Sequence, residues 1–175
     1  NATDGTVAIG KSSLGALTSG AANIAIGYQS GLETTIGDYN VYIGYQAAYR
    51  TANLNNQHNT MVGYQAGGGD WTSTLSSKNT AVGSLSMVGA MNSALENTAV
   101  GYRSLNAITT GDNNTAIGTD AGDELTDGHN NVAIGSATLG TSTSVGFATA
   151  VGQQAMGSGD VTAAADGTVA IGYKA

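Results

Sequence analysis

One glycine recurs ten times along this chain at a nearly constant interval of 17 to 20 residues. A fixed period near 20 residues is typical of solenoid proteins, in which each repeat buries its apolar face by stacking on its neighbours. The recurrence runs through almost all of the 175 residues, so we expect one β-solenoid repeat domain over 1–175, as a segment of a longer protein. We call the recurring positions the anchor glycines: Gly10, Gly27, Gly44, Gly63, Gly83, Gly101, Gly118, Gly135, Gly152 and Gly172.

The residues just before each anchor glycine have the pattern of a β-strand. The preceding residue is always Ile or Val, and the residue two positions earlier is Val, Ile or Thr. Branched residues at a spacing of two favour a strand, because alternate side chains share one face of a sheet. We therefore predict one short strand per repeat and about ten coils. We expect the invariant Ile/Val position to face the inside of the coil.

The position between the two branched residues is alanine in eight repeats, with Tyr42 and Met61 as the exceptions. A solvated face would carry long polar side chains, so this stripe indicates that another sheet or another chain packs closely over it. Each strand is also preceded by asparagine in seven successive repeats: Asn23, Asn40, Asn59, Asn79, Asn97, Asn114 and Asn131. Stacked once per coil, these side chains are expected to form a structural amide ladder.

The segments between the strands are less regular. Each spacer has room for a turn, a weaker return strand and a second turn, with turn signals such as Gly111-Asp112 and Asp127-Gly128. The longer repeats carry their extra residues here, around His58 and Trp71 among other places. In solenoids such insertions often lie on the binding face.

Composition excludes several classes of function. Charged residues make up 10% of the chain, against roughly 25% in an ordinary domain. The net charge of −7 with five basic residues argues against a nucleic-acid partner. There is no cysteine, and no apolar stretch approaches the length of a membrane span, so we expect no membrane insertion of this segment.

The repeated motif Asn-x-Ala-Ile/Val-Gly-x-x-Ser/Ala, as in Asn114-Thr115-Ala116-Ile117-Gly118, resembles the β-roll of trimeric autotransporter adhesin heads and the repeats of phage tail fibres. This resemblance covers the chain from Thr6 to Ala175. It implies an all-β, left-handed parallel β-roll that assembles side by side as a homotrimer. It also implies no catalytic residues. In such a trimer the alanine column becomes the subunit interface, represented by Ala25, Ala81, Ala99, Ala116 and Ala133.

No enzyme signature is present. His58 and His129 lie in Asn-rich turns without Cys or Glu at the spacing of metal ligands, and we expect neither a metal nor a cofactor. Four acids fall in one spacer, Asp120, Asp123, Glu124 and Asp127; calcium prefers oxygen ligands, but their spacing favours solvated turn acids.

Two groups of residues are candidates for contact with a receptor. The first is Trp71, Asp70, His58 and Tyr49, because the single tryptophan stands in a glycine-rich loop of a long spacer. The second is the residue after the anchor glycine, which is tyrosine at Tyr28, Tyr45, Tyr64, Tyr102 and Tyr173. These rings predict either a stacked ladder that stabilises the sheet or a sugar-binding platform.

The leading hypothesis is a structural and adhesive fibre segment of a phage tail fibre that presents loops to a glycan or protein receptor on the host surface. The first alternative is the head of a bacterial trimeric adhesin. Either implies an extracellular place, on a virion or a cell surface. An alternative of another class is an ice-binding solenoid, suggested by the threonines at Thr60, Thr80, Thr98 and Thr115. These share a face with the Ile/Val column, and an inward face would argue against ice binding.

Overall fold

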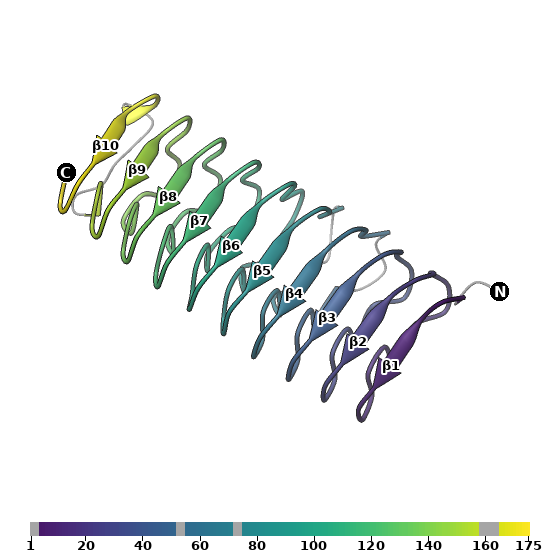
Figure 1. Cartoon of the computed structure of the whole chain (residues 1–175). Helices are drawn as coiled ribbons and strands as arrows, with labels where there is room; N and C mark the ends of the chain where they lie inside the picture. The colour runs from purple at the N-terminus through teal and green to yellow at the C-terminus, as the bar shows by residue number, and fades with distance from the viewer. Residues whose placement is uncertain (1–3, 52–54, 72–74, 158–164) are drawn as a thin grey trace.

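The computed structural model describes residues 4–51, 55–71, 75–157 and 165–175. In these residues the chain is an all-β solenoid of about nine turns, built on one parallel sheet whose strands follow in sequence order (Figure 1). Each strand has three residues: β1 (Val7–Ile9), β2 (Ile24–Ile26), β3 (Val41–Ile43), β4 (Thr60–Val62), β5 (Thr80–Val82), β6 (Thr98–Val100), β7 (Thr115–Ile117), β8 (Val132–Ile134), β9 (Thr149–Val151) and β10 (Val169–Ile171). The repeat assignment and the strand positions are therefore confirmed.

Equivalent positions of successive repeats pair in register. Ala99 of β6 lies opposite Ala116 of β7, and Val100 lies opposite Ile117. The same register holds at each of the other strand pairs, so every column of the sequence repeat becomes a straight row of side chains along the solenoid.

The direction of the two strand faces is the reverse of the prediction. The middle residue is buried in every strand from β2 to β9, whereas both flanking residues are half-buried or exposed. Ala116 is 0% exposed and Ile117 is 40% exposed. The expectation that the Ile/Val column faces inward is therefore wrong.

The alanine column fills the inside of each coil and is not a free surface. Ala25, Ala81, Ala99, Ala116 and Ala133, predicted as the oligomer interface, belong to the buried core of the single chain. The coil is narrow, and larger side chains from its return half, such as Leu105, Leu125 and Leu139, occupy the same core. Small side chains on the strand leave room for them, which explains why alanine recurs there.

Larger residues enter this column where the return half supplies a glycine. A Cβ atom on Gly31 would lie 2.8 Å from Cδ2 of Tyr42, and one on Gly67 would lie 2.7 Å from Sδ of Met61. The two exceptions to the alanine column are therefore compensated by missing side chains across the core.

The anchor glycines end the strands at a turn that no other residue can take. Gly101 has φ +138°, and a Cβ atom there would collide with the carbonyl oxygen of Gly118 in the next coil. The coils approach so closely at this corner that the glycine is required both by its backbone conformation and by space.

The asparagine column forms the predicted ladder. In each step, Oδ1 of one asparagine accepts from both the backbone N–H and Nδ2 of the next, as between Asn23 and Asn40 at 3.0 and 3.1 Å. Nδ2 also donates to a carbonyl of the return half, which for Asn40 is that of Asn56 at 2.9 Å. All seven side chains are buried, so the ladder is internal and leaves no amide group for a ligand.

The predicted return strand is absent from the described residues. The return halves of successive coils are instead joined by backbone hydrogen bonds that do not form a strand ladder, such as Leu105 N–H to Ala121 O and Ala107 N–H to Asp123 O, each at 3.0 Å. One isolated parallel bridge joins Arg50 and Asp70. Many return positions have positive φ, Leu105 among them at 46°, and this prevents an extended conformation.

Candidate functional site

The most continuous exposed apolar feature is the outer face of the sheet, which we call the Ile/Val face. It consists of the first and third residues of the strands. Its third-position side chains are substantially exposed in the middle of the solenoid, with Val82 and Val100 at 37% and Ile117 at 40%. The first position is occupied by threonine in β4 to β7, so the face also carries a row of hydroxyl groups.

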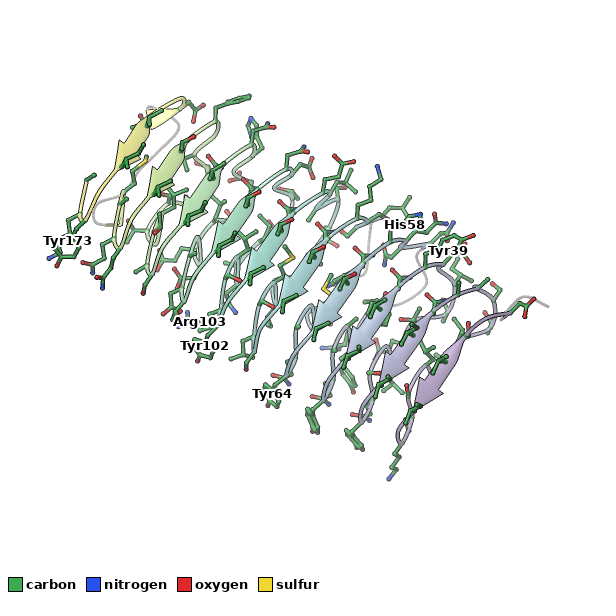
Figure 2. All side chains as sticks on the ribbon, viewed as in Figure 1. Tyr39, His58, Tyr64, Tyr102, Arg103 and Tyr173 are labelled. Atoms are coloured by element: carbon green, nitrogen blue, oxygen red, sulfur yellow. The ribbon has the colours of Figure 1, made fainter. Side chains whose placement is uncertain are left out.

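A tyrosine ladder follows the edge where the strands end. The rings of Tyr28 and Tyr45 are stacked with their centroids 5.2 Å apart, and those of Tyr45 and Tyr64 are 5.5 Å apart. The stacking expected of this column is therefore confirmed for the first three tyrosines. Figure 2 shows Tyr64, Tyr102 and Tyr173 projecting from this same long edge of the molecule.

A second ladder of glutamine side chains runs beside the rings. Gln46 Nε2 donates to Gln29 Oε1 and Gln65 Nε2 donates to Gln46 Oε1, each at 2.9 Å. Each of these Oε1 atoms therefore points toward the following coil, in the direction of the C-terminal end of the solenoid. The position equivalent to Gln65 in the next coil is Leu85, so the glutamine ladder ends at Gln65.

The opposite long edge carries different pairs. Tyr39 and His58 project there (Figure 2), and their rings stack with centroids 5.0 Å apart. Lys78 Nζ and Glu96 Oε1 form an ion pair of 2.7 Å, in which both side chains are about half exposed. Exposed pairs of this kind contribute little to stability, on the order of 0–1 kcal/mol.

The four predicted receptor contacts do not come together as one site. Trp71 is fully buried and lies against Gly67 in the core, so its prediction as a surface contact is wrong. Asp70 forms an ion pair of 2.6 Å with Arg50 Nε. His58 stacks on Tyr39, and Tyr49 is half-buried. No hydrogen bond or ring contact joins His58, Tyr49 and Asp70 to one another in the part of the chain that the structure describes.

The acidic spacer is partly neutralised by a basic residue. Arg103 lies 3.3 Å from a carboxylate oxygen of Asp123 and 3.6 Å from one of Asp120. Burial, with Asp120 beside it, raises the pKa of the Asp123 carboxyl, against the opposing effect of Arg103. Among the described residues, no group of three or more acidic, histidine or cysteine side chains is arranged to hold a metal ion.

One buried phenol lies inside the solenoid. Tyr42 is 0% exposed, and burial raises its pKa, while the hydroxyls of Thr34 and Thr51 act in the opposite direction. Thr34 and Thr51 are hydrogen-bonded to each other at 2.6 Å. This cluster is enclosed by the coil and is a feature of the core rather than of the surface.

A shallow hollow lies between two turns and is lined by Ser19, Gly37, Asp38 and Asn55 among others. Asp38 Oδ1 accepts from the backbone N–H of Ala21 at 2.7 Å, and its Oδ2 accepts from Gln57 Nε2 at 3.3 Å. Both carboxylate oxygens are thus engaged within the protein, so the hollow offers little for recognition.

No helix among the described residues has both the length and the apolar character needed to cross a bilayer. Comparison with known proteins gave no matching family model, no similar curated protein and no similar solved structure.

Proposed function

We propose that this chain is a rigid structural and adhesive segment of a phage tail fibre. In this proposal it assembles side by side as a homotrimer and carries a binding surface for a host-surface glycan or protein. The observation that carries the proposal is the Ile/Val face, whose third-position Ile and Val side chains are exposed or half-buried in every strand from β1 to β10. Large contiguous apolar patches are unusual on a monomer and mark surfaces that another molecule covers.

A second copy of the same chain is the binding partner that fits this face best. The stripe repeats with the coil period, so identical rods placed side by side present the same row of side chains to one another along their length. The repeat motif adds the resemblance to trimeric fibres and adhesin heads. The head of a bacterial trimeric adhesin fits the same assembly and remains the first alternative.

The oligomeric state tests the assembly. We expect the purified chain to sediment at three times its 17.3 kDa mass. Ile117→Asp should dissociate it with little loss of β-structure, since this side chain is already 40% exposed in the single chain. Thr119→Asp, two residues further on at an exposed edge position, is the matched control and should leave the trimer intact. A stable monomer of the unmodified chain would contradict the assembly.

Binding to cells tests the adhesive part separately. Fluorescently labelled chain should bind a subset of a panel of bacterial isolates in flow cytometry, and excess unlabelled chain should compete. Uniform absence of binding across the panel would count against adhesion, whatever the oligomeric state.

An ice-binding solenoid is retained as a second candidate because of one observation. Thr60, Thr80, Thr98 and Thr115 lie on the outer face of the sheet, in a straight row along the rod. This removes the argument that the threonines face inward. Thermal hysteresis of a monomeric preparation would favour this candidate, whereas a trimer without hysteresis would eliminate it.

A further inference from the structure

The tyrosine ladder is interrupted at one coil. The residue after the anchor glycine is Tyr64 in the coil of β4, Ser84 in the coil of β5 and Tyr102 in the coil of β6. Backbone hydrogen bonds keep these three coils in register, from Leu85 N–H to Tyr64 O at 2.9 Å and from Arg103 N–H to Ser84 O at 3.1 Å. A small side chain therefore stands between two exposed aromatic rings on the same edge.

The interruption leaves a space of the thickness of one ring. Neighbouring tyrosines in the intact part of the ladder have centroids 5.2 and 5.5 Å apart. Two coil steps separate Tyr64 from Tyr102, which corresponds to a separation of about 10 Å at the spacing of adjacent strands. Stacked rings prefer centroid distances of about 4.5–7 Å, so this separation accommodates one additional ring in contact with both tyrosines.

Both rings are available to such a ligand. Tyr64 is 50% exposed and Tyr102 is 48% exposed. Tyr64 has Tyr45 on one face, and its other face is directed toward the coil of Ser84. Figure 2 shows Tyr64 and Tyr102 projecting in the same direction from the edge, with the coil of β5 between them.

From this geometry we infer that Tyr64 and Tyr102 form a slot across Ser84 that binds one neutral pyranose ring of a glycan. The inference rests on the proposed adhesive function and names the ligand class. The C–H groups of a pyranose carry partial positive charge and pack against the negative faces of aromatic rings. Its hydroxyl groups lie around the rim of the ring, where the slot has polar atoms.

The polar atoms of the slot suit hydroxyl groups. Ser84 supplies a hydroxyl at the base. Gln65 supplies the Oε1 atom at the end of the glutamine ladder. The next residue in that column is Leu85, whose side chain has no hydrogen-bond donor. A phenylalanine ring from a protein partner would cover the Ser84 hydroxyl and Gln65 Oε1 without pairing them, which is costly.

Charge favours a neutral sugar over an acidic one. The basic residue beside the slot is Arg103, and its guanidinium group is directed to Asp123 and Asp120 at 3.3 and 3.6 Å. Its positive charge is therefore largely compensated within the protein. The chain as a whole carries a net charge of −7, which disfavours anionic ligands further.

The test fills the slot with the residue that the ladder lacks. Ser84→Tyr should place a ring between Tyr64 and Tyr102, continue the stack and leave the melting temperature unchanged or higher. Ser136→Tyr is the matched control, because Ser136 also follows an anchor glycine but has Thr119 and Gln153 as its column neighbours. Tyr64→Leu is a second variant, which keeps an apolar side chain but removes the aromatic face.

The probes are the methyl glycosides of glucose, galactose and mannose, measured by saturation-transfer difference NMR on the full chain. We expect transfer to the ring protons of at least one glycoside with the unmodified protein and with Ser136→Tyr. Ser84→Tyr and Tyr64→Leu should reduce this transfer at least five-fold. Equal transfer with Ser84→Tyr, or no transfer from any glycoside at tens of millimolar, would overturn the slot.

Two further readouts separate the possibilities. If N-acetyl-tyrosinamide binds in a manner sensitive to Ser84→Tyr while no glycoside does, the slot accepts an aromatic residue of a protein and the sugar assignment is wrong. If Ser84→Tyr still binds cells as the unmodified chain does, the adhesive function stands and the slot is rejected. If glycosides bind the slot but no cell surface is recognised, the slot stands and the adhesive function fails.

Discussion

Asn114 and Asn97 are joined by two hydrogen bonds to one oxygen atom. The Oδ1 atom of Asn97 accepts from the backbone N–H of Asn114 at 2.9 Å and from its Nδ2 at 3.0 Å. Asn114 Nδ2 also donates to the carbonyl of Gly128 at 2.8 Å, and Asn114 Oδ1 accepts from Nδ2 of Asn131 at 2.9 Å. Each polar atom of this buried side chain is thus paired, and the side chain links its own coil to both neighbours.

The first prediction concerns this link. Asn114→Ala should lower the free energy of unfolding by about 2–4 kcal/mol, because it leaves the Gly128 carbonyl and the backbone N–H of Asn131 without partners in the core. Urea denaturation followed by circular dichroism at one protein concentration measures the loss. Asn113→Ala is the control, since this exposed neighbour has φ 59° and Ala22 occupies the equivalent position at φ 55°. Equal losses for the two variants would show that the ladder does not carry the stability.

The repeat pattern was sufficient to predict most of the fold. The anchor glycines and the asparagines gave the number, position and parallel stacking of the strands, because both columns are required by the close approach of successive coils. The contact of Gly101 with Gly118 recurs at the same corner from Gly10 to Gly172, and the contact of Asn97 with Asn114 recurs in the coils from Asn23 to Asn131. Handedness and assembly were not accessible in this way, since they depend on contacts that no single column encodes.

The facing of the strands was predicted incorrectly, although the sequence contained a signal for it. Alternation by two separates the faces but does not say which one is inward, and hydrophobicity favoured Ile117 over Ala116 for the core. The asparagine supplies the missing information, because Asn114 and Ala116 are two residues apart and share a face. If the amide ladder is buried, the alanine must be buried with it.

The candidate site was predicted only in part. The tyrosine column was recognised from its spacing, whereas Trp71 was expected at the surface because glycines precede it. One of these glycines, Gly67, makes room for the indole and for Met61 inside the coil. The slot between Tyr64 and Tyr102 depends on the absence of a ring at Ser84. Only the register of the coils shows that Ser84 lies between these two rings.

A second prediction tests the exchange of volume across the core. Gly31→Ala should destabilise the protein by about 1–3 kcal/mol more than Gly122→Ala, because its Cβ would be 2.8 Å from both the Tyr42 ring and Leu14. Gly122 has nearly the same φ, 59° against 61°, and its Cβ would first meet the flexible end of Leu105 at 3.0 Å. Thermal melts of the two variants provide the comparison. Indistinguishable melting temperatures would mean that Tyr42 moves aside freely.

The third prediction follows from the raised pKa of Asp123. Burial and Asp120 raise it, Arg103 opposes the shift and Glu124 adds to it. The stability contributed by this carboxyl is then fully present below its unfolded-state pKa and is lost as the pH rises through its folded-state pKa. Asp123→Asn should therefore melt higher than the unmodified protein at pH 7, and this difference should disappear near pH 3. Melting temperatures at both pH values check this prediction, and Asp127→Asn is the control because Asp127 is exposed. A lower melting temperature of Asp123→Asn at pH 7 would show that the contact of Asp123 with Arg103 outweighs the cost of its burial.

The last prediction distinguishes the inside of the coil from its outer face. Ala116 is 0% exposed, so Ala116→Arg would force a charged side chain into a space that fits a methyl group. We expect a loss of about 4 kcal/mol or more, with unfolding of the neighbouring coils, because burial of an unpaired charge and overpacking act together. Thr119→Arg, at an exposed edge position in the same repeat, should leave the fold unchanged. Circular dichroism and limited proteolysis report on the fold, and sedimentation reports on assembly. If Ala116→Arg dissociated an otherwise folded protein, the alanine column would be a subunit interface after all, and the Ile/Val face would lose its proposed role.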